Sequence, residues 1–209
     1  ILTDVIYVTS GATLTIEAGT VIRGEPDADG TPTTADAGNL VITRGSKIRA
    51  LGTQENPIVF TDLVDDNIKG YPGLQFPYNS RVDLPGTTGK WGGLVLLGRG
   101  YVANGTGAGP SAAKENQIEG LTATSEKGFY GGCAEYPSEF NPTLDPSSCD
   151  DDDSGTVRYV SLRYGGILLS ANNEINGITF GGVGRNADLE YIEVFQNKDD
   201  CSEYFGGAV

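Results

Sequence analysis

The segment LTIEAGTVIR at residues 14–23 recurs as LVITRGSKIR at residues 40–49. Both follow the pattern L-x-I-x-x-G-[ST]-x-I-R, and a looser copy with its glycine displaced by one begins at Leu94. Apolar and polar residues alternate within each copy, which is typical of a short strand with one buried face. The glycine in the middle indicates a turn between two such strands.

A second repeat lies further along the chain, where VRYVSL at 157–162 matches LEYIEV at 189–194, with INGITF at 175–180 between them. No window sustains the 3.6-residue period of a helix of three turns or more. Equivalent residues that recur before the same glycine indicate stacked rungs, because a sandwich does not require such a repeat. We therefore predict an all-β parallel β-helix, one domain over residues 1–209, with these residues stacked inside: Leu14, Ile16, Ile22, Leu40, Ile42, Ile48, Leu94 and Leu96.

Four long insertions separate the predicted strands and are rich in Gly, Pro, Asp, Ser and Thr, as loops are. In a stacked-rung fold such loops gather on one side and often form the binding face, so we expect function to lie there. The insertions span residues 25–38, 62–89, 103–116 and 122–154.

The charge balance excludes several classes of protein. The chain has 14 Lys+Arg, 28 Asp+Glu and no His, which gives a formal net charge of −14. A nucleic-acid partner is excluded, because so acidic a chain repels a phosphate backbone. Without histidine there is no Ser-His-Asp machinery and no imidazole zinc site. No stretch approaches the ~20 apolar residues of a membrane span.

An ordered series of motifs resembles an uncharacterised family of secreted or cell-surface bacterial proteins, often anchored as lipoproteins. The resemblance covers about residues 5–209. It implies a right-handed parallel β-helix with long loop insertions and an extracellular or outer-surface location, and it assigns no catalytic residue. In that family further rungs follow, so we expect a natural chain longer than this one. The motifs are WGGLVLLG (91–98), IEG (118–120), YGG (130–132), VRYVSLRYGG (157–166), EINGITFGGVG (174–184) and DDCSEYFGG (199–207).

The three cysteines fall into two groups. Cys133 and Cys149 lie in one loop-like segment, whereas Cys201 stands apart. A Cys133–Cys149 disulfide suits an oxidising compartment and would contribute about 3 kcal/mol in the chain-entropy model. The alternative is three free thiols. The resembling family has a small residue at the place of Cys201, so a partner cysteine further along the chain is also open.

The densest acidic run predicts a calcium site. Asp150, Asp151, Asp152 and Asp153 follow one another directly. Adjacent carboxylates repel one another unless a cation screens them, and Ca²⁺ prefers six to eight oxygen ligands from a flexible loop. The alternative is a solvated acidic loop, as charge runs usually are.

Two smaller clusters are further candidates for calcium. Asp199, Asp200 and Glu203 follow a predicted strand and could converge on one cation, or else hydrogen-bond the amides of a turn. Asp27 and Asp29 are similar to the opening of a calcium loop but lack the later Glu of an EF-hand.

These observations favour a non-enzymatic extracellular protein, structural or adhesive and stabilised by Ca²⁺, with a glycan as a possible partner. Its uncovered terminal rungs predict end-to-end self-association. The alternative is a polysaccharide lyase or glycoside hydrolase acting on acidic glycans, an analogy at the level of the fold. In that case Arg158 or Arg163 would act as the base, although arginines at alternate strand positions are more often paired with their neighbours.

Overall fold

The computed structural model describes residues 1–26, 37–63, 65, 88–102, 115–121, 127–132, 150–170 and 173–208. The strands are β1 (Val5–Val8), β2 (Thr13–Ile16), β3 (Val21–Gly24), β4 (Asn39–Ile42), β5 (Lys47–Leu51), β6 (Ile58–Asp62), β7 (Leu94–Leu97), β8 (Glu115–Gln117), β9 (Phe129–Gly131), β10 (Gly155–Arg163), β11 (Leu168–Ser170), β12 (Asn173–Glu174), β13 (Ile178–Gly181), β14 (Asp188–Phe195) and β15 (Ser202–Phe205).

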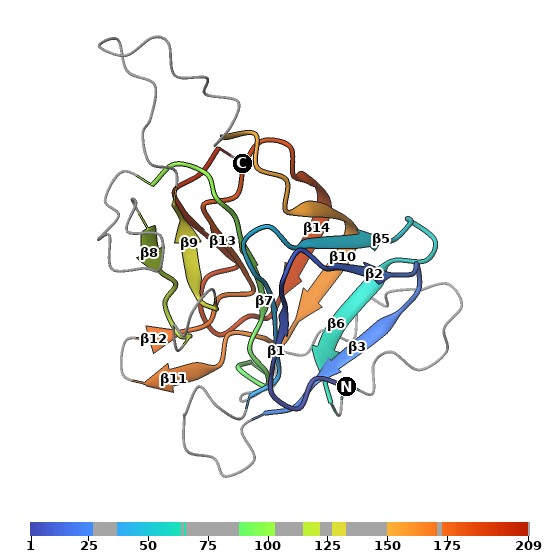
Figure 1. Cartoon of the computed structure of the whole chain (residues 1–209). Helices are drawn as coiled ribbons and strands as arrows, with labels where there is room; N and C mark the ends of the chain where they lie inside the picture. The colour runs from blue at the N-terminus through green and yellow to red at the C-terminus, as the bar shows by residue number, and fades with distance from the viewer. Residues whose placement is uncertain are drawn as a thin grey trace, which may run out of the picture.

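The strands stack as rungs with three sides (Figure 1). The first sheet, in the order β1-β4-β7-β13-β15, is parallel throughout. The second sheet is strongly bent, because the first half of β10 pairs with β5 and its second half pairs with β6. Strand β14 repeats β10 one rung further on. Successive rungs are therefore β1-β2-β3, β4-β5-β6, β7-β10 and β13-β14, which confirms the predicted parallel β-helix.

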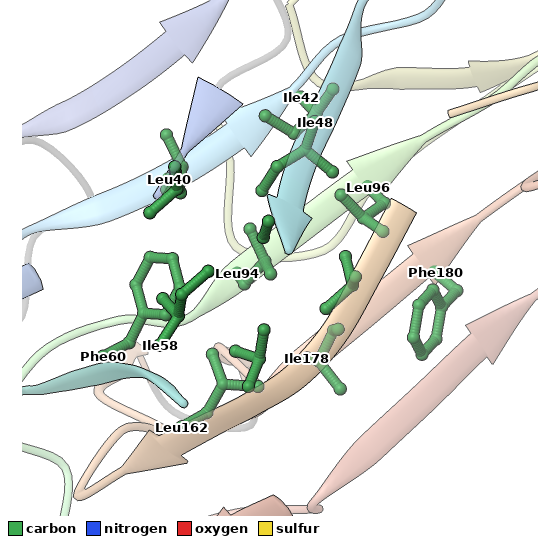
Figure 2. Packing of buried hydrophobic residues seen from close by; sticks show 14 of the residues in the cluster. Leu40, Ile42, Ile48, Ile58, Phe60, Leu94, Leu96, Leu162, Ile178 and Phe180 are labelled. Carbon is green, nitrogen blue, oxygen red and sulfur yellow. The ribbon is translucent and has the colours of Figure 1, made fainter. Parts of the chain in front are cut away.

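The lumen of the helix is filled by ladders of apolar side chains (Figure 2). Leu40, Leu94 and Ile178 occupy one register position in three successive strands and are at most 3 % exposed. Each such side chain contributes about 1.5–3 kcal/mol when it is fully buried. All eight residues predicted to lie inside belong to this core, with Leu14 and Ile22 only partly buried.

A second apolar core lies on the outer face of the first sheet. Val41 and Val95 point away from the lumen and yet are buried. They pack with Ile118 and Tyr130, which belong to the segment of the antiparallel hairpin β8–β9. Strands β4 and β7 are covered on both faces and are therefore buried at every position. Strands of this kind are almost continuously apolar in sequence rather than alternating.

The register of the first repeat differs from the prediction. Equivalent residues of segments 14–23 and 40–49 do not stack on one another, because β2 pairs with β5 and β3 pairs with β6. Leu14 therefore lies beside Ile48 rather than Leu40. The repeat compares one side of a rung with the next side, because both segments need apolar residues at the alternate positions that face the lumen and a left-handed glycine, Gly19 or Gly45, at the corner that follows. The second repeat is in register, with Val157 beside Leu189.

Candidate functional site

Tyr159 and Tyr191 form the corners at which β10 and β14 pass from one side of the rung to the next. Their φ angles are 49° and 55°, in the left-handed region. An L-residue other than glycine adopts this conformation at a cost of about 1–2 kcal/mol. Their neighbours Val160 and Ile192 are ladder partners, so the two strained tyrosines lie one above the other.

The two tyrosine rings stack on the outside of the helix. Their centroids are 4.4 Å apart with an interplanar angle of 9°, and Tyr191 is 65 % exposed. The pKa of the Tyr159 hydroxyl is raised, first by loss of solvation and then by Tyr191, Glu55 and Glu190. Tyr159 is therefore protonated at neutral pH, in surroundings with negative charge.

A shallow groove of about 190 Å³ opens beside this pair of rings. One wall comes from the loop between β5 and β6, and the other comes from β10 and β14. The groove combines aromatic and aliphatic surface with an amide, a hydroxyl and a carboxylate, which is a lining suited to a ligand with both apolar faces and hydroxyl groups. Its lining residues are Gln54, Pro57, Tyr159, Val160, Ser161, Tyr191 and Glu193.

The polar side of the groove is held by hydrogen bonds. The Ser161 hydroxyl donates to Glu193 Oε2 at 2.7 Å, and Arg163 Nε donates to Ser161 Oγ at 2.8 Å. Arg163 Nη2 lies 3.6 Å from Glu193 Oε2, and Arg163 is only 5 % exposed. A buried guanidinium thus orients a carboxylate whose side chain keeps 38 % of its surface exposed.

The predicted arginine bases are engaged with neighbouring carboxylates. Arg158 Nη2 lies 2.8 Å from Asp188 Oδ2 and 3.5 Å from Glu190 Oε2. Arg163 is directed at Ser161 and Glu193. Both arginines follow the simpler of the two predictions, in which arginines at alternate strand positions pair with their neighbours.

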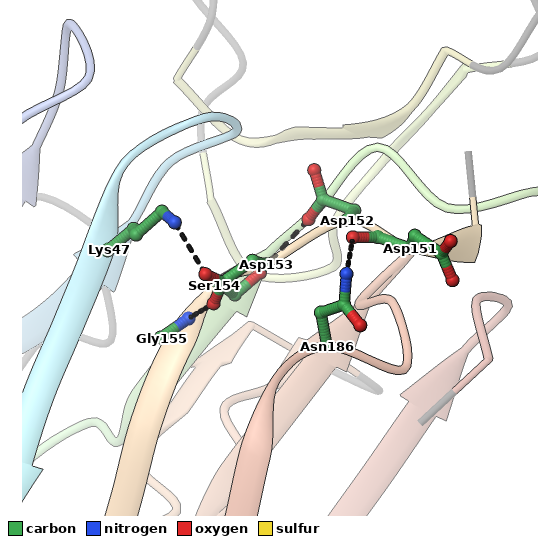
Figure 3. A network of polar contacts seen from close by, with 7 residues as sticks. All are labelled: Lys47, Asp151, Asp152, Asp153, Ser154, Gly155 and Asn186. Atoms are coloured by element: carbon green, nitrogen blue, oxygen red, sulfur yellow. Dashed lines mark hydrogen bonds and ion pairs between the residues drawn. The ribbon is translucent and has the colours of Figure 1, made fainter. Parts of the chain in front are cut away.

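The acidic run at 150–153 forms the turn that leads into β10 (Figure 3). Asp153 pairs with Lys47, and its other oxygen accepts a hydrogen bond from the Gly155 amide at 2.8 Å. Asp151 pairs with Arg185. The pKa of Asp152 is raised, mainly by burial.

This turn is a packed junction rather than a freely solvated loop. Asp150 is 6 % exposed, its backbone oxygen accepts from the Arg185 amide at 2.7 Å, and its carboxylate accepts from the Tyr101 amide at 3.3 Å. Among the residues that the structure describes, no group of three or more His, Cys, Asp or Glu side chains is arranged to hold a metal ion. Calcium binding by Asp150–Asp153 stays a prediction.

The second acidic cluster spans the corner before β15 and the start of that strand. Asp199 and Asp200 are exposed, and the backbone oxygen of Asp200 accepts from the Gly177 amide at 3.0 Å. Glu203 accepts a hydrogen bond from Asn176 Nδ2, and its pKa is raised by burial and then by Glu119, Asp200 and Asp199. Backbone hydrogen bonds close this turn. Binding of a cation by Asp199, Asp200 and Glu203 stays a prediction.

The remaining predicted site residues lie outside the described part of the chain. These are Asp27 and Asp29 of the third calcium candidate and Cys133 and Cys149 of the predicted disulfide. Cys201 is described, and it is a free and exposed thiol. The sequence did not predict the groove, because function was expected in the insertions, whereas most of the groove-lining residues belong to β10 and β14. The available signal was a tyrosine at the same place in both copies of the second repeat.

Comparison with known proteins identifies a family for nearly the whole chain. Residues 1–76 and 80–209 match the family described as a pectate-lyase-like beta helix domain. Neither the curated proteins nor the solved structures include a match to this sequence. Within the described residues, no helix is long and apolar enough to cross a membrane.

Proposed function

This chain belongs to the family of pectate-lyase-like β-helix domains, and we propose that it binds a polysaccharide chain in the groove beside Tyr159 and Tyr191. The observation that carries the proposal is the stacked pair of tyrosine rings, which borders the groove and leaves Tyr191 65 % exposed. The ordered series of motifs that resembles secreted and cell-surface bacterial proteins supports a location outside the cytoplasm.

The aromatic pair suits a sugar for an electrostatic reason. The face of an aromatic ring is negative, and the C–H bonds on one face of a pyranose ring are weakly positive. The two tyrosines keep left-handed backbone angles, and such strain persists only where the surroundings enforce it and is often found at binding sites. Here the strain brings both rings to the outer surface at one corner.

The size and polarity of the groove fit one ring of a longer saccharide. Its volume of about 190 Å³ is below the 300–1,000 Å³ of typical pockets that enclose a small ligand. Gln54 and Glu193 offer an amide and a carboxylate to sugar hydroxyl groups, and the buried Ser161 holds Glu193 in place by its hydrogen bond. The rest of the chain would run outside the groove.

Binding without cleavage is the reading we favour. Glycoside hydrolysis usually employs two carboxyl groups that flank the bond. Glu193 is the only carboxylate among the groove-lining residues that the structure describes. A lyase needs a base with free access to the sugar, and Arg158 and Arg163 are both directed at carboxylates. The family description is nevertheless the observation in favour of a polysaccharide lyase or hydrolase as a second candidate.

Binding and cleavage can be measured in one experiment. The protein is incubated with a panel of neutral, acidic and basic polysaccharides, and both retention and release of oligosaccharides are recorded. We expect retention without release, and Tyr191→Ala should weaken it about tenfold, since loss of a stacked aromatic contact costs about 0.5–1.5 kcal/mol beyond its buried area.

Tyr204→Ala is the matched control. Tyr204 is also exposed, at 58 %, and also stacks on an aromatic ring, Phe180, but it lies in the first sheet. Equal loss in both variants, or no retention of any glycan, would refute the proposal. Release of oligosaccharides would replace it with the enzymatic alternative.

We keep four further proposals from the sequence: a structural or adhesive role, stabilisation by calcium, a Cys133–Cys149 disulfide and end-to-end self-association. A surface polysaccharide as ligand is consistent with adhesion, because a groove open to solvent is accessible to a polymer of any length.

A further inference from the structure

We infer that the groove selects saccharides that carry free amino groups over uncharged and acidic ones. This inference rests on the proposed function and specifies its ligand. The ligand it specifies is positively charged, whereas the enzymatic alternative from the sequence expects negatively charged, acidic glycans.

The first argument is the charge around the tyrosine pair. Glu193 lines the groove, and Glu55 and Glu190 lie close enough to raise the pKa of Tyr159. Arg158 pairs with Glu190, and Arg163 lies beside Glu193. Arg158 is shared between Glu190 and a further carboxylate, Asp188, so its single charge is divided between two acidic groups.

The second argument is access to these carboxylates. The side chains of Glu193 and Glu190 are 38 % and 49 % exposed, so a ligand can reach them. Arg163 is buried behind Ser161, and the guanidinium of Arg158, although its side chain is 42 % exposed, is shared between Asp188 and Glu190. A uronate would therefore meet accessible negative charge, whereas an ammonium group would find an acceptor in Glu193.

The third argument is the aromatic surface itself. A cation over the face of a tyrosine is attracted by the ring, and the attraction increases when the cation is partly desolvated. An amino sugar that stacks on Tyr191 would hold its ammonium group between an aromatic face and the Glu193 carboxylate. The formal net charge of −14 adds long-range attraction in the same direction.

Three oligosaccharides of equal length test the inference by calorimetric titration: β-1,4-linked glucosamine, its fully N-acetylated counterpart and α-1,4-linked galacturonate. The pH is chosen so that amines are protonated and carboxylates are ionised. We expect the glucosamine oligomer to bind at least about tenfold more tightly than the acetylated one, with affinity falling as salt is added. Galacturonate should bind most weakly.

Glu193→Gln locates the effect. It should weaken binding of the glucosamine oligomer about tenfold more than binding of the acetylated oligomer, because the glutamine amide can still hydrogen-bond a sugar hydroxyl but carries no charge. Glu203→Gln removes the same charge from β15 in the first sheet and should change neither.

The outcomes separate the inference from the proposed function. Equal binding of the glucosamine and acetylated oligomers, abolished by Tyr191→Ala, overturns the inference and leaves the proposed function intact. Tightest binding of galacturonate also overturns it. If none of the three oligomers and no glycan of the wider panel binds, both the inference and the proposed function are overturned.

Discussion

Arg44 Nη1 lies 2.6 Å from Glu115 Oε1, and neither side chain is exposed to solvent. Arg44 belongs to the turn after β4, and Glu115 is the first residue of β8, 71 positions later. Arg44 Nη1 also donates to the backbone oxygen of Gly131 at the end of β9. This buried ion pair therefore attaches the hairpin β8–β9, which covers the outer face of the first sheet, to the second rung.

Removing one partner of this pair should destabilise the fold strongly. Glu115→Ala leaves the Arg44 charge buried beside a cavity, and breaking a buried pair costs about 3–5 kcal/mol. Urea unfolding followed by the fluorescence of the single tryptophan, Trp91, measures the change. Arg185→Ala is the control, because its pair with Asp151 is partly exposed and should contribute less than about 1 kcal/mol. Equal losses in both variants would contradict this account.

Two glycines with left-handed φ angles should respond differently to alanine. A Cβ at Gly155 would lie 1.9 Å from the backbone oxygen of Ile48, its partner in β5, whereas a Cβ at Gly45 finds its nearest neighbour at 3.9 Å. Gly45→Ala should cost only the backbone strain, about 1–2 kcal/mol. Gly155→Ala should cost more, because β10 must move away from β5. Comparable melting temperatures for the two variants would show that the β5–β10 contact is looser than the structure indicates.

Stability should rise as the pH is lowered from neutral toward the ordinary pKa range of carboxylates. The pKa values of Asp152 and Glu203 are raised above 3.8 and 4.5, so the folded state binds protons more readily than the unfolded state. Their unfavourable contribution therefore grows as the pH rises through this window and is absent below it. Urea unfolding at a series of pH values checks the sign. Glu203→Gln should flatten the curve, and an unchanged slope would exclude Glu203 as a cause.

Calcium, if it binds to the native state, should raise the melting temperature with the free metal concentration. The measurement compares excess chelator with millimolar Ca²⁺, and Mg²⁺ serves as the control cation. Asp151→Asn combined with Asp153→Asn should remove the shift if the turn before β10 holds the ion. No shift in the unaltered protein would refute the calcium prediction for all three acidic clusters.

Sequence alone predicted the stacked strands, the lumen residues and the register of the second repeat. These features depend on local chemistry, since alternation selects a strand with one buried face and a glycine permits the corner. Val157 and Leu189 could be matched because the segments 157–162 and 189–194 that contain them align without a gap.

Only the tertiary structure decided which side of a rung each strand occupies. All three sides require an apolar residue at each position that faces the lumen, so Leu14 resembles Leu40 in pattern although it lies beside Ile48. The insertions also differ in length from rung to rung, which removes any constant period from the sequence. The groove and the buried ion pair depend on contacts outside the second repeat: Gln54 and Pro57 line the groove opposite β10, and Arg44 meets Glu115 across 71 positions. Such contacts follow from the stacking of rungs, which no local pattern of residues encodes.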